Sequence, residues 1–197
     1  MDVVQITKTL DVAGVLAAYR EGCFPMGYPG RRVITWHCPD RRAVLPLDAL
    51  HVSRSLVRRM RKGGFRVSFD EAFGEVMRGC AERESTWITH DIFRVYGELH
   101  RDGIAHSVEV WIDDTLAGGL YGIHLGGAFF AESKFHRVTD MSKVALVAMA
   151  RRLAGRGFRF MEVQYLTEHL AQFGVREVDH GSYMGMLSEA LGMECTF

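Results

Sequence analysis

The sequence predicts an α+β fold in which an antiparallel or mixed sheet is flanked by helices, with a smaller α/β domain in front of it. The first observation is the order of elements after residue 103, which is strand, hairpin, strand, helix, strand. The second is the run 118–135, where two largely apolar segments meet at Gly126-Gly127, as expected for strands that are buried on both faces. The third is the length of 197 residues, enough for one sizeable domain or two small ones. We place the boundary near residue 103, which gives domains of 1–103 and 104–197.

The expected helices of the first half begin at residues that often cap helices, namely Asp11, Ser53, Asp70 and Thr89. A side-chain oxygen at this position accepts a hydrogen bond from a backbone N–H of the first turn. These helices run through residues 21, 62, 80 and 101. Short strands are expected over 33–36, 42–45 and 65–69. The segment 24–30 is dense in turn residues and is expected to be a loop.

The second half alternates strands and helices. Strands over 105–112 and 115–123 meet at Asp113-Asp114, a tight-turn dipeptide. A strand over 127–133 and a helix over 139–154 follow. The remaining elements are a strand over 158–165, a short helix over 168–172, a strand over 175–178 and a helix from about Ser182. This order is that of an N-acetyltransferase-like fold.

The composition is that of an ordinary soluble globular protein, with 48% hydrophobic and 24% charged residues. The sequence shows neither an apolar run of 18 residues nor a signal peptide, so no membrane association is expected. The four cysteines lack Cys-x-x-Cys spacing, which predicts reduced thiols in a cytoplasm and no zinc site. The nine histidines form no metal-ligand pattern, and we interpret His106 and His169 as structural.

Positive charge is concentrated in the first third of the chain. Residues 1–66 hold 12 Lys and Arg against 5 Asp and Glu. Five of these cations fall on the helix expected after Ser53, and they are Arg54, Arg58, Arg59, Arg61 and Lys62. Without an acid among them they repel one another unless an anion lies nearby. This pattern is typical of a helix that binds nucleic-acid phosphates, and it also occurs on a solvated surface helix.

A single carboxylate, Glu132, stands among phenylalanines in the second strand of the hairpin. Because side chains alternate along a strand, Glu132 is expected to share a face with Phe130, while Phe129, Ala131 and Ser133 share the other. A carboxylate in such surroundings must be paired, protonated or bound to a cation. A half-exposed Glu at a strand end is the alternative.

Several motifs occur together in one order along the chain. They are Ala-Tyr-Arg-Glu-Gly-Cys-Phe-Pro (18–25), Pro-Asp-Arg-Arg-Ala-Val-Leu (39–45), Thr-Trp-Ile-Thr (86–89), Ala-His-Ser-Val-Glu-Val-Trp (105–111), Gly-Gly-Leu-Tyr-Gly (118–122), Phe-Phe-Ala-Glu-Ser-Lys-Phe (129–135) and Ser-Lys-Val-Ala-Leu (142–146). With them the sequence resembles the leucyl/phenylalanyl-tRNA–protein transferases from about residue 11 to about residue 185.

This resemblance implies an enzyme that moves Leu, Phe or Met from aminoacyl-tRNA to the α-amine of proteins that begin with Arg or Lys. Such proteins are thereby marked for degradation by the N-end rule. The reaction is aminolysis of an ester, which requires no cofactor and no metal. A cytoplasmic monomer is expected.

The resemblance also implies roles for particular residues. Gln164 orients the attacking amine through its carbonyl oxygen, and Glu162, expected on the same strand face, fixes the direction of the amide. Glu132 binds the ammonium of either the aminoacyl group or the acceptor. The remaining substrate-binding residues are Tyr19, Trp87, Leu120, Phe129, Ser133, Leu146, Met149, Leu153 and Met161. Among these, Leu146, Met149 and Leu153 form one helical stripe, which also suits a plain hydrophobic core.

The chain departs from the family pattern at Met26, His37 and Lys134, where Trp, Trp and Met are common, and it lacks the usual N-terminal extension. These changes affect the aromatic platform for the tRNA end and the choice of substrate. Two other functions fit the same fold. An acyl-CoA-dependent N-acyltransferase would need a Gly-rich turn before a helix, and 136–140 contains no glycine. A non-catalytic RNA-binding module would need only the basic helix.

Overall fold

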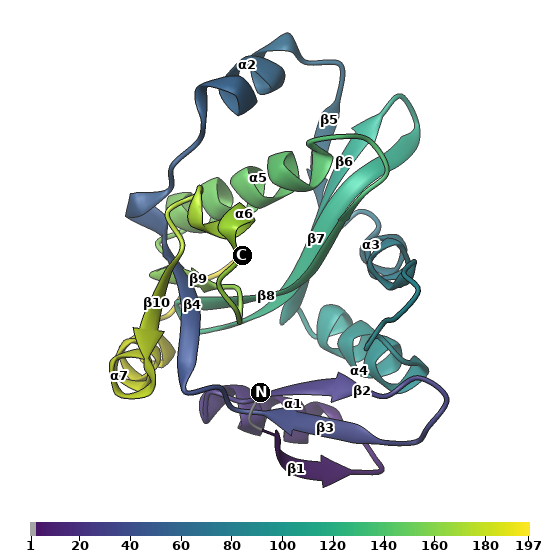
Figure 1. The fold of residues 1–197 in the computed structure, drawn as a ribbon, viewed down its shortest axis with the longest axis vertical. Coiled ribbons are helices and arrows are strands. Elements are labelled where there is room, and N and C mark those ends of the chain that lie inside the picture. Colours follow the sequence, from purple (N-terminus) through teal and green to yellow (C-terminus); the bar gives the residue numbers. More distant parts are fainter. Residues whose placement is uncertain (1–2) are drawn as a thin grey trace.

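The computed structural model describes residues 3–197, which form a small sheet and a large sheet with helices around them (Figure 1). The small sheet has the order β1-β3-β2, with β1 at Val3–Thr7, β2 at Phe24–Gly27 and β3 at Ile34–His37. All its pairs are antiparallel. The segment 24–30, expected as a loop, thus begins with a strand, because its aromatic and apolar residues pair with β3. Helix α1 (Val12–Arg20) precedes β2, and Asp11 caps it as predicted.

The large sheet has seven strands in the order β10-β4-β9-β8-β7-β6-β5. Only β8 and β9 run parallel, and the other pairs are antiparallel. The strands are β4 (Arg41–Pro46), β5 (Arg66–Phe69), β6 (Ala105–Ile112), β7 (Thr115–Leu125), β8 (Ala128–His136), β9 (Phe160–Glu162) and β10 (Arg176–Asp179). This mixed sheet confirms the predicted α+β fold. It takes β4 and β5 from before residue 103, so that position does not separate two sheets.

Helices cover both faces of the large sheet and create two hydrophobic cores. Helix α5 (Met141–Gly155) packs on one face. Helices α3 (Phe73–Ala81) and α4 (His90–Arg101) pack on the other, where the small sheet and α1 also lie (Figure 1). The remaining helices are η1 (Leu47–Ala49), α2 (Arg54–Lys62), α6 (Glu168–Ala171) and α7 (His180–Leu191). None of the helices in residues 3–197 has both the length and the apolar character needed to cross a membrane.

Two of the predicted helix caps act differently in the structure. Asp70 lies in the left-handed region (φ 60°) and precedes α3 by three residues, so it is not the cap. Its carboxylate instead accepts hydrogen bonds from the Ser107 backbone N–H and the His106 ring, both at 2.8 Å. Thr89 occupies the N-cap position of α4 without a side-chain hydrogen bond to that helix. Ser53 caps α2 as predicted.

A bulge in β8 changes the alternation expected around Glu132. Tyr121 of β7 pairs with Ser133 and Gly122 pairs with Ala131, so Glu132 is the extra residue. Glu132 stays on the face of Phe130, as predicted. Ser133 follows it onto that face, where its hydroxyl accepts a hydrogen bond from Arg83, and its predicted grouping with Ala131 is wrong.

Cys23 and Cys38 form a disulfide, which corrects the prediction that all four cysteines are reduced. The two residues stand just outside the paired ends of β2 and β3, at Phe24 and His37. Strand pairing therefore brings together two cysteines that are 15 residues apart in the sequence. Cys80 and Cys195 are free.

Candidate active site

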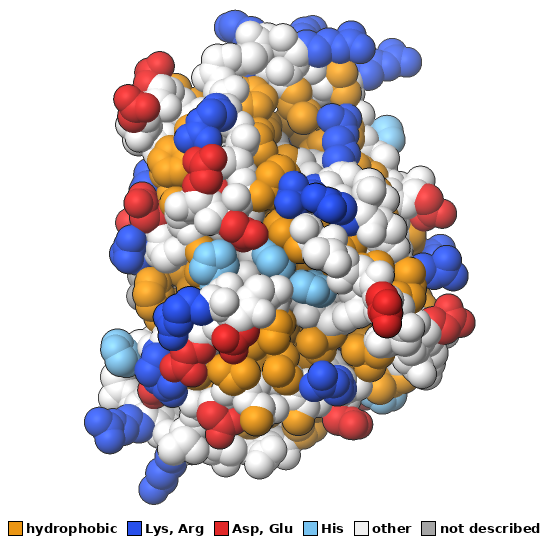
Figure 2. All heavy atoms as spheres, turned by 180° about the vertical axis from the view of Figure 1, so that it is seen from behind, with side chains coloured by type: hydrophobic (Ala, Val, Ile, Leu, Met, Phe, Trp, Pro, Cys, Tyr) orange, Lys and Arg blue, Asp and Glu red, His pale blue; other side chains and the backbone are white. Residues whose placement is uncertain are grey.

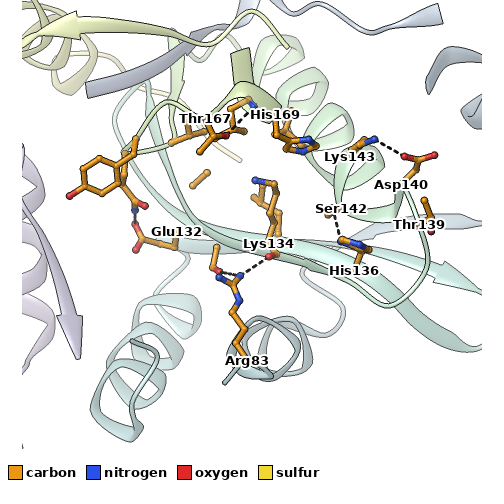
Figure 3. Close-up of a pocket in the computed structure, with 18 residues that line it drawn as sticks. Arg83, Glu132, Lys134, His136, Thr139, Asp140, Ser142, Lys143, Thr167 and His169 are labelled. Atoms are coloured by element: carbon orange, nitrogen blue, oxygen red, sulfur yellow. Dashed lines mark hydrogen bonds and ion pairs between the residues drawn. The ribbon is translucent and has the colours of Figure 1, made fainter. Parts of the chain in front are cut away.

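A pocket of about 650 Å³ opens between β8, the start of α5 and the segment 163–170 (Figure 3). Its apolar wall consists of Leu120, Ala131, Leu146, Val163 and Leu170. Its polar wall consists of Arg83, Glu132, Ser133, Lys134, His136, Thr139, Asp140, Ser142, Lys143, Gln164, Tyr165, Thr167 and His169. The pocket is therefore apolar on one side and rich in polar and cationic groups on the other.

Glu132 lies at one side of this pocket and is 6% exposed. Tyr19 from α1 donates a hydrogen bond to its Oε1 atom, and Tyr96 from α4 donates to Oε2 at 3.3 Å. The two tyrosine hydroxyls are also 2.8 Å apart. The bulge in β8 and two helices of the first half of the chain thus hold this carboxyl group in one orientation.

Burial raises the pKa of Glu132 to about 8. The hydrogen bond from Tyr19 acts in the opposite direction, and the nearby Glu162 raises the pKa further. Burial, together with Glu132, also raises the pKa of Tyr19 and of Tyr96 well above the ordinary value, so both remain donors. At neutral pH these surroundings therefore favour a protonated Glu132. A cation bound beside it would favour the carboxylate.

The side chain of Gln164 also lies at this site, but its backbone conformation is not the one that strand alternation predicts. Strand β9 ends at Glu162, and Gln164 has a left-handed backbone with φ 64°. The expectation that Glu162 and Gln164 share a strand face is therefore wrong. The side-chain Nε2 of Gln164 donates to Glu132 Oε1 at 3.4 Å, while its backbone N–H donates to Glu162 Oε1 at 2.7 Å. With the amide nitrogen turned to Glu132, the carbonyl oxygen is the atom left to accept from a substrate.

Glu162 does not line the pocket and is 1% exposed. Arg42 from β4, itself 1% exposed, donates to both carboxylate oxygens, at 3.2 and 2.8 Å. Arg42 also donates to the Gly22 backbone oxygen, and its guanidinium stacks on Phe24 and Tyr183 at 5.1 and 4.7 Å from the ring centroids. Burial lowers the pKa of Arg42, but the attraction and hydrogen bonds of Glu162, together with Tyr183 and Tyr19, outweigh burial and raise that pKa overall. Glu162 thus holds the backbone of Gln164 and does not reach the pocket.

The structure brings only some of the predicted substrate-binding residues to the pocket. Leu120, Ser133 and Leu146 line it. The others are fully or almost fully buried in the two cores or packed against them, and they are Tyr19, Trp87, Phe129, Met149, Leu153 and Met161. The α5 stripe is therefore mainly core, because only its first member, Leu146, faces the opening.

Sequence reasoning missed Arg42 and the cationic residues of the pocket. Arg42 lies inside a quoted motif, but nothing local shows that it pairs with a residue 120 positions later. His169, interpreted as structural, lines the pocket together with His136 and Lys143. Lys134 was singled out only as a departure from the family pattern, and that departure was the signal that a changed side chain stands in the pocket.

The basic helix α2 lies at one end of the molecule, away from the pocket-lining residues (Figure 1). Leu56 of this helix is buried. Four of its cations are exposed, and they are Arg54, Arg58, Arg61 and Lys62. Arg59 instead donates to the Gly63 oxygen at 2.9 Å and stacks on Phe65. Figure 2 shows Lys and Arg side chains gathered at this end of the molecule.

Within residues 3–197, no group of three or more His, Cys, Asp or Glu is arranged to hold a metal ion.

The raised pKa of Glu132 predicts a pH-dependent stability. Between pH 4 and 8 the folded state keeps a proton on Glu132 that the unfolded chain has lost, so stability falls as pH rises through this window. Glu132→Gln removes this titration. In urea denaturation at pH 5 and pH 8, the wild type is expected to lose more unfolding free energy than Glu132→Gln. Equal losses in the two proteins would show that Glu132 is already ionised in the folded protein at pH 5.

Comparison with solved structures gives a similar fold. A crystal structure of FemX superposes with a TM-score of 0.54 at 14% identity, covering 72% of this chain and 60% of that one. A GCN5-related N-acetyltransferase from Kribbella flavida superposes with a TM-score of 0.45 at 12% identity, covering 84% and 59%. At these identities the likeness to FemX concerns the fold alone.

Comparison of sequences is more specific. A leucyl/phenylalanyl-tRNA–protein transferase of Salinibacter ruber is 51% identical, covering 90% of this chain and 78% of its own length. One from Herpetosiphon aurantiacus is 44% identical, covering 98% and 100%. The family model for the leucyl/phenylalanyl-tRNA protein transferase N-terminal domain matches residues 8–40, and that for leucyl/phenylalanyl-tRNA protein transferase matches residues 44–188. The chain therefore belongs to the leucyl/phenylalanyl-tRNA–protein transferase family.

Proposed function

We propose that this chain transfers Leu, Phe or Met from aminoacyl-tRNA to the α-amine of proteins that begin with Arg or Lys. The observation that carries the proposal is the buried Glu132 with Gln164 beside it, at the edge of a pocket with an apolar wall. This arrangement offers one acceptor for an ammonium group and one for an uncharged amine. The family membership supplies the donor and acceptor classes. The acceptor is thereby marked for N-end-rule degradation, and the enzyme works as a cytoplasmic monomer.

The reaction forms one bond and breaks one bond. The neutral α-amine of the acceptor attacks the ester carbonyl carbon, and the bond from that carbon to the ribose oxygen breaks. A proton leaves the amine and ends on the ribose oxygen. Because an α-amine has a pKa of about 7.7–8.0, a useful fraction is already neutral. The enzyme therefore acts mainly by holding both partners in the reactive geometry.

The charge of the aminoacyl amine and that of the acceptor amine decide which of them binds to Glu132 and which to Gln164. The attacking amine must lose its charge, whereas a carboxylate favours the charged form of a neighbouring amine. Glu132 therefore suits the α-ammonium of the aminoacyl group, which stays charged throughout. The carbonyl oxygen of Gln164 suits the attacking amine, since it accepts a hydrogen bond without favouring a positive charge. Glu162 and Arg42 are positioning residues that hold the backbone of Gln164.

The exposed cations of α2 are expected to bind the tRNA backbone. Replacing Arg54, Arg58 and Arg61 together by Ala should weaken tRNA binding and reduce the slope of log K against log salt concentration by about three. Filter binding between 50 and 300 mM salt measures the affinity for tRNA and the slope of its salt dependence. A matched control replaces three exposed arginines elsewhere, Arg101, Arg151 and Arg156. An unchanged slope for the α2 variant would mean that this helix is only solvated surface.

One assay tests the proposed function against both alternatives. The protein is incubated with Leu-tRNA, Phe-tRNA or acetyl-CoA and with peptides that differ only in their first residue. Transfer from charged tRNA to peptides that begin with Arg or Lys is expected. Transfer from acetyl-CoA alone would indicate an acyl-CoA-dependent enzyme. Binding of tRNA without transfer would indicate an RNA-binding module.

A further inference from the structure

Four residues place cationic or titratable nitrogen atoms at the side of the pocket away from Glu132. These are Lys134 and His136 from β8, Lys143 from α5 and His169 from α6, here called the cationic end. Figure 3 shows Lys134 between Glu132 and the His136–Lys143 side of the pocket. These four residues are also close enough to affect one another electrostatically. Burial lowers the pKa of His169, and Lys134, Lys143 and His136 lower it further.

The protein balances only part of the charge at the cationic end. Lys143 is paired with Asp140 at 2.8 Å, and the ring of His136 lies 3.2 Å from the Ser142 hydroxyl. Arg83 donates to the Ser133 hydroxyl and to the Lys134 backbone oxygen, at 3.0 and 2.9 Å. Lys134 takes part in none of the ion pairs of residues 3–197. Burial and Arg83 both lower its pKa, so a bound anion would relieve an unfavourable charge.

The donors at the cationic end suit a phosphate group. Lys134 supplies an ammonium, the histidines supply ring N–H groups, and the hydroxyls of Thr139, Ser142 and Thr167 also line the pocket. A phosphate accepts several charge-assisted hydrogen bonds at once, whereas a carboxylate has fewer acceptor sites. The stem of Lys134 stands opposite Leu120 in the β7–β8 pair, so its methylene groups extend the apolar wall and its ammonium is the part left for an anion.

We propose that the cationic end is a phosphate subsite for the phosphate group 5′ to the terminal nucleotide of aminoacyl-tRNA, with Lys134 as its main cation. This inference rests on the proposed function. An aminoacylated nucleotide carries an ammonium at one end and a phosphate at the other. The pocket presents charges in the complementary order, with Glu132 on one side and the cationic end on the other. The ester lies between them, next to Gln164.

The test compares donors that differ only in this phosphate. One donor is 3′-O-phenylalanyl-adenosine, and the other is the same compound with a 5′-phosphate. The wild type is expected to prefer the phosphorylated donor by roughly tenfold in kcat/KM, the size of one hydrogen bond to a charged group. Lys134→Met keeps an unbranched side chain that is one atom shorter but removes its charge, and the ratio between the donors should fall close to one. Lys134→Arg should restore much of the ratio.

A binding measurement makes the test independent of turnover. Calorimetry should give the wild type a similar preference for AMP over adenosine, which Lys134→Met loses. Arg101→Met, which removes an exposed cation outside the pocket, should keep both ratios, and thermal melts check that each variant folds. The proposal is wrong if wild-type protein uses the two donors equally and binds AMP and adenosine equally. It is also wrong if Lys134→Met keeps the wild-type preference for the phosphorylated compounds.

Two further outcomes separate this inference from the proposed function. If Lys134→Met changes the choice among Leu, Phe and acidic amino acids but leaves the phosphate ratio unchanged, Lys134 contacts the amino-acid side chain and the subsite is wrong. If no charged donor supports transfer, Phe-tRNA included, while the Lys134-dependent preference for AMP remains, the proposed function fails and the phosphate subsite stands.

Discussion

Arg42→Met is expected to lower the free energy of unfolding by about 3–5 kcal/mol, the usual result of removing one partner of a buried ion pair. Arg42 and Glu162 are each 1% exposed and 2.8 Å apart. The substitution leaves the Glu162 carboxylate buried without its cation. It also leaves the Gly22 oxygen without its donor. Chemical denaturation at neutral pH measures the loss.

The neighbouring Arg41 provides a matched control. Its side chain is 69% exposed and lies 3.9 Å from Glu177, so Arg41→Met should change stability by less than about 0.5 kcal/mol. Replacing both members of the buried pair, with Arg42→Met and Glu162→Leu, should recover part of the loss because no unpaired charge remains. A single Arg42→Met variant as stable as the Arg41→Met control would mean that the buried pair does not hold the fold together.

Gln164→Ala is expected to lower kcat by roughly 10²-fold or more, since it removes the group proposed to orient the attacking amine. The backbone N–H of residue 164 still donates to Glu162, so the local fold is expected to persist. Initial rates with Leu-tRNA and Phe-tRNA give kcat and KM for each donor. The loss should fall on kcat with both donors, because the amide acts on the acceptor and not on the amino-acid side chain.

Gln5→Ala serves as the control for this experiment. Gln5 is exposed in β1, does not line the pocket and should give wild-type rates. Thermal melts establish that both variants are folded. If folded Gln164→Ala transferred Leu at the wild-type rate, the amide would not orient the amine, and the positioning of the two substrates by the rest of the pocket would have to account for the reaction.

The disulfide and the buried pair meet at one place in the fold. Cys23 is flanked by Gly22, whose oxygen accepts from Arg42, and by Phe24, whose ring stacks on the Arg42 guanidinium. Cys38 precedes β4, the strand that carries Arg42. Both segments that surround Arg42 are therefore covalently joined. This connects the small sheet to the residues that hold Gln164.

Much of the fold follows from the sequence because helices and hairpins depend on local patterns. Asp11 and Ser53 cap α1 and α2 as expected, and the hairpin turns fall at 113–114 and 126–127. These features depend on nearby residues, so a single sequence is enough to predict them. Strand β2 was missed because its pairing partner, β3, decides its structure.

The sequence also determined the family and named Glu132 and Gln164, but only the tertiary structure decided how they meet. The bulge at Glu132 and the left-handed backbone at Gln164 break the alternation on which the expected strand faces depended. Arg42 and Glu162 are 120 positions apart, and Lys134, Lys143 and His169 come from three separate elements. A buried charge is stable only with partners that the whole fold brings to it, and no local pattern in the sequence records which partners those are.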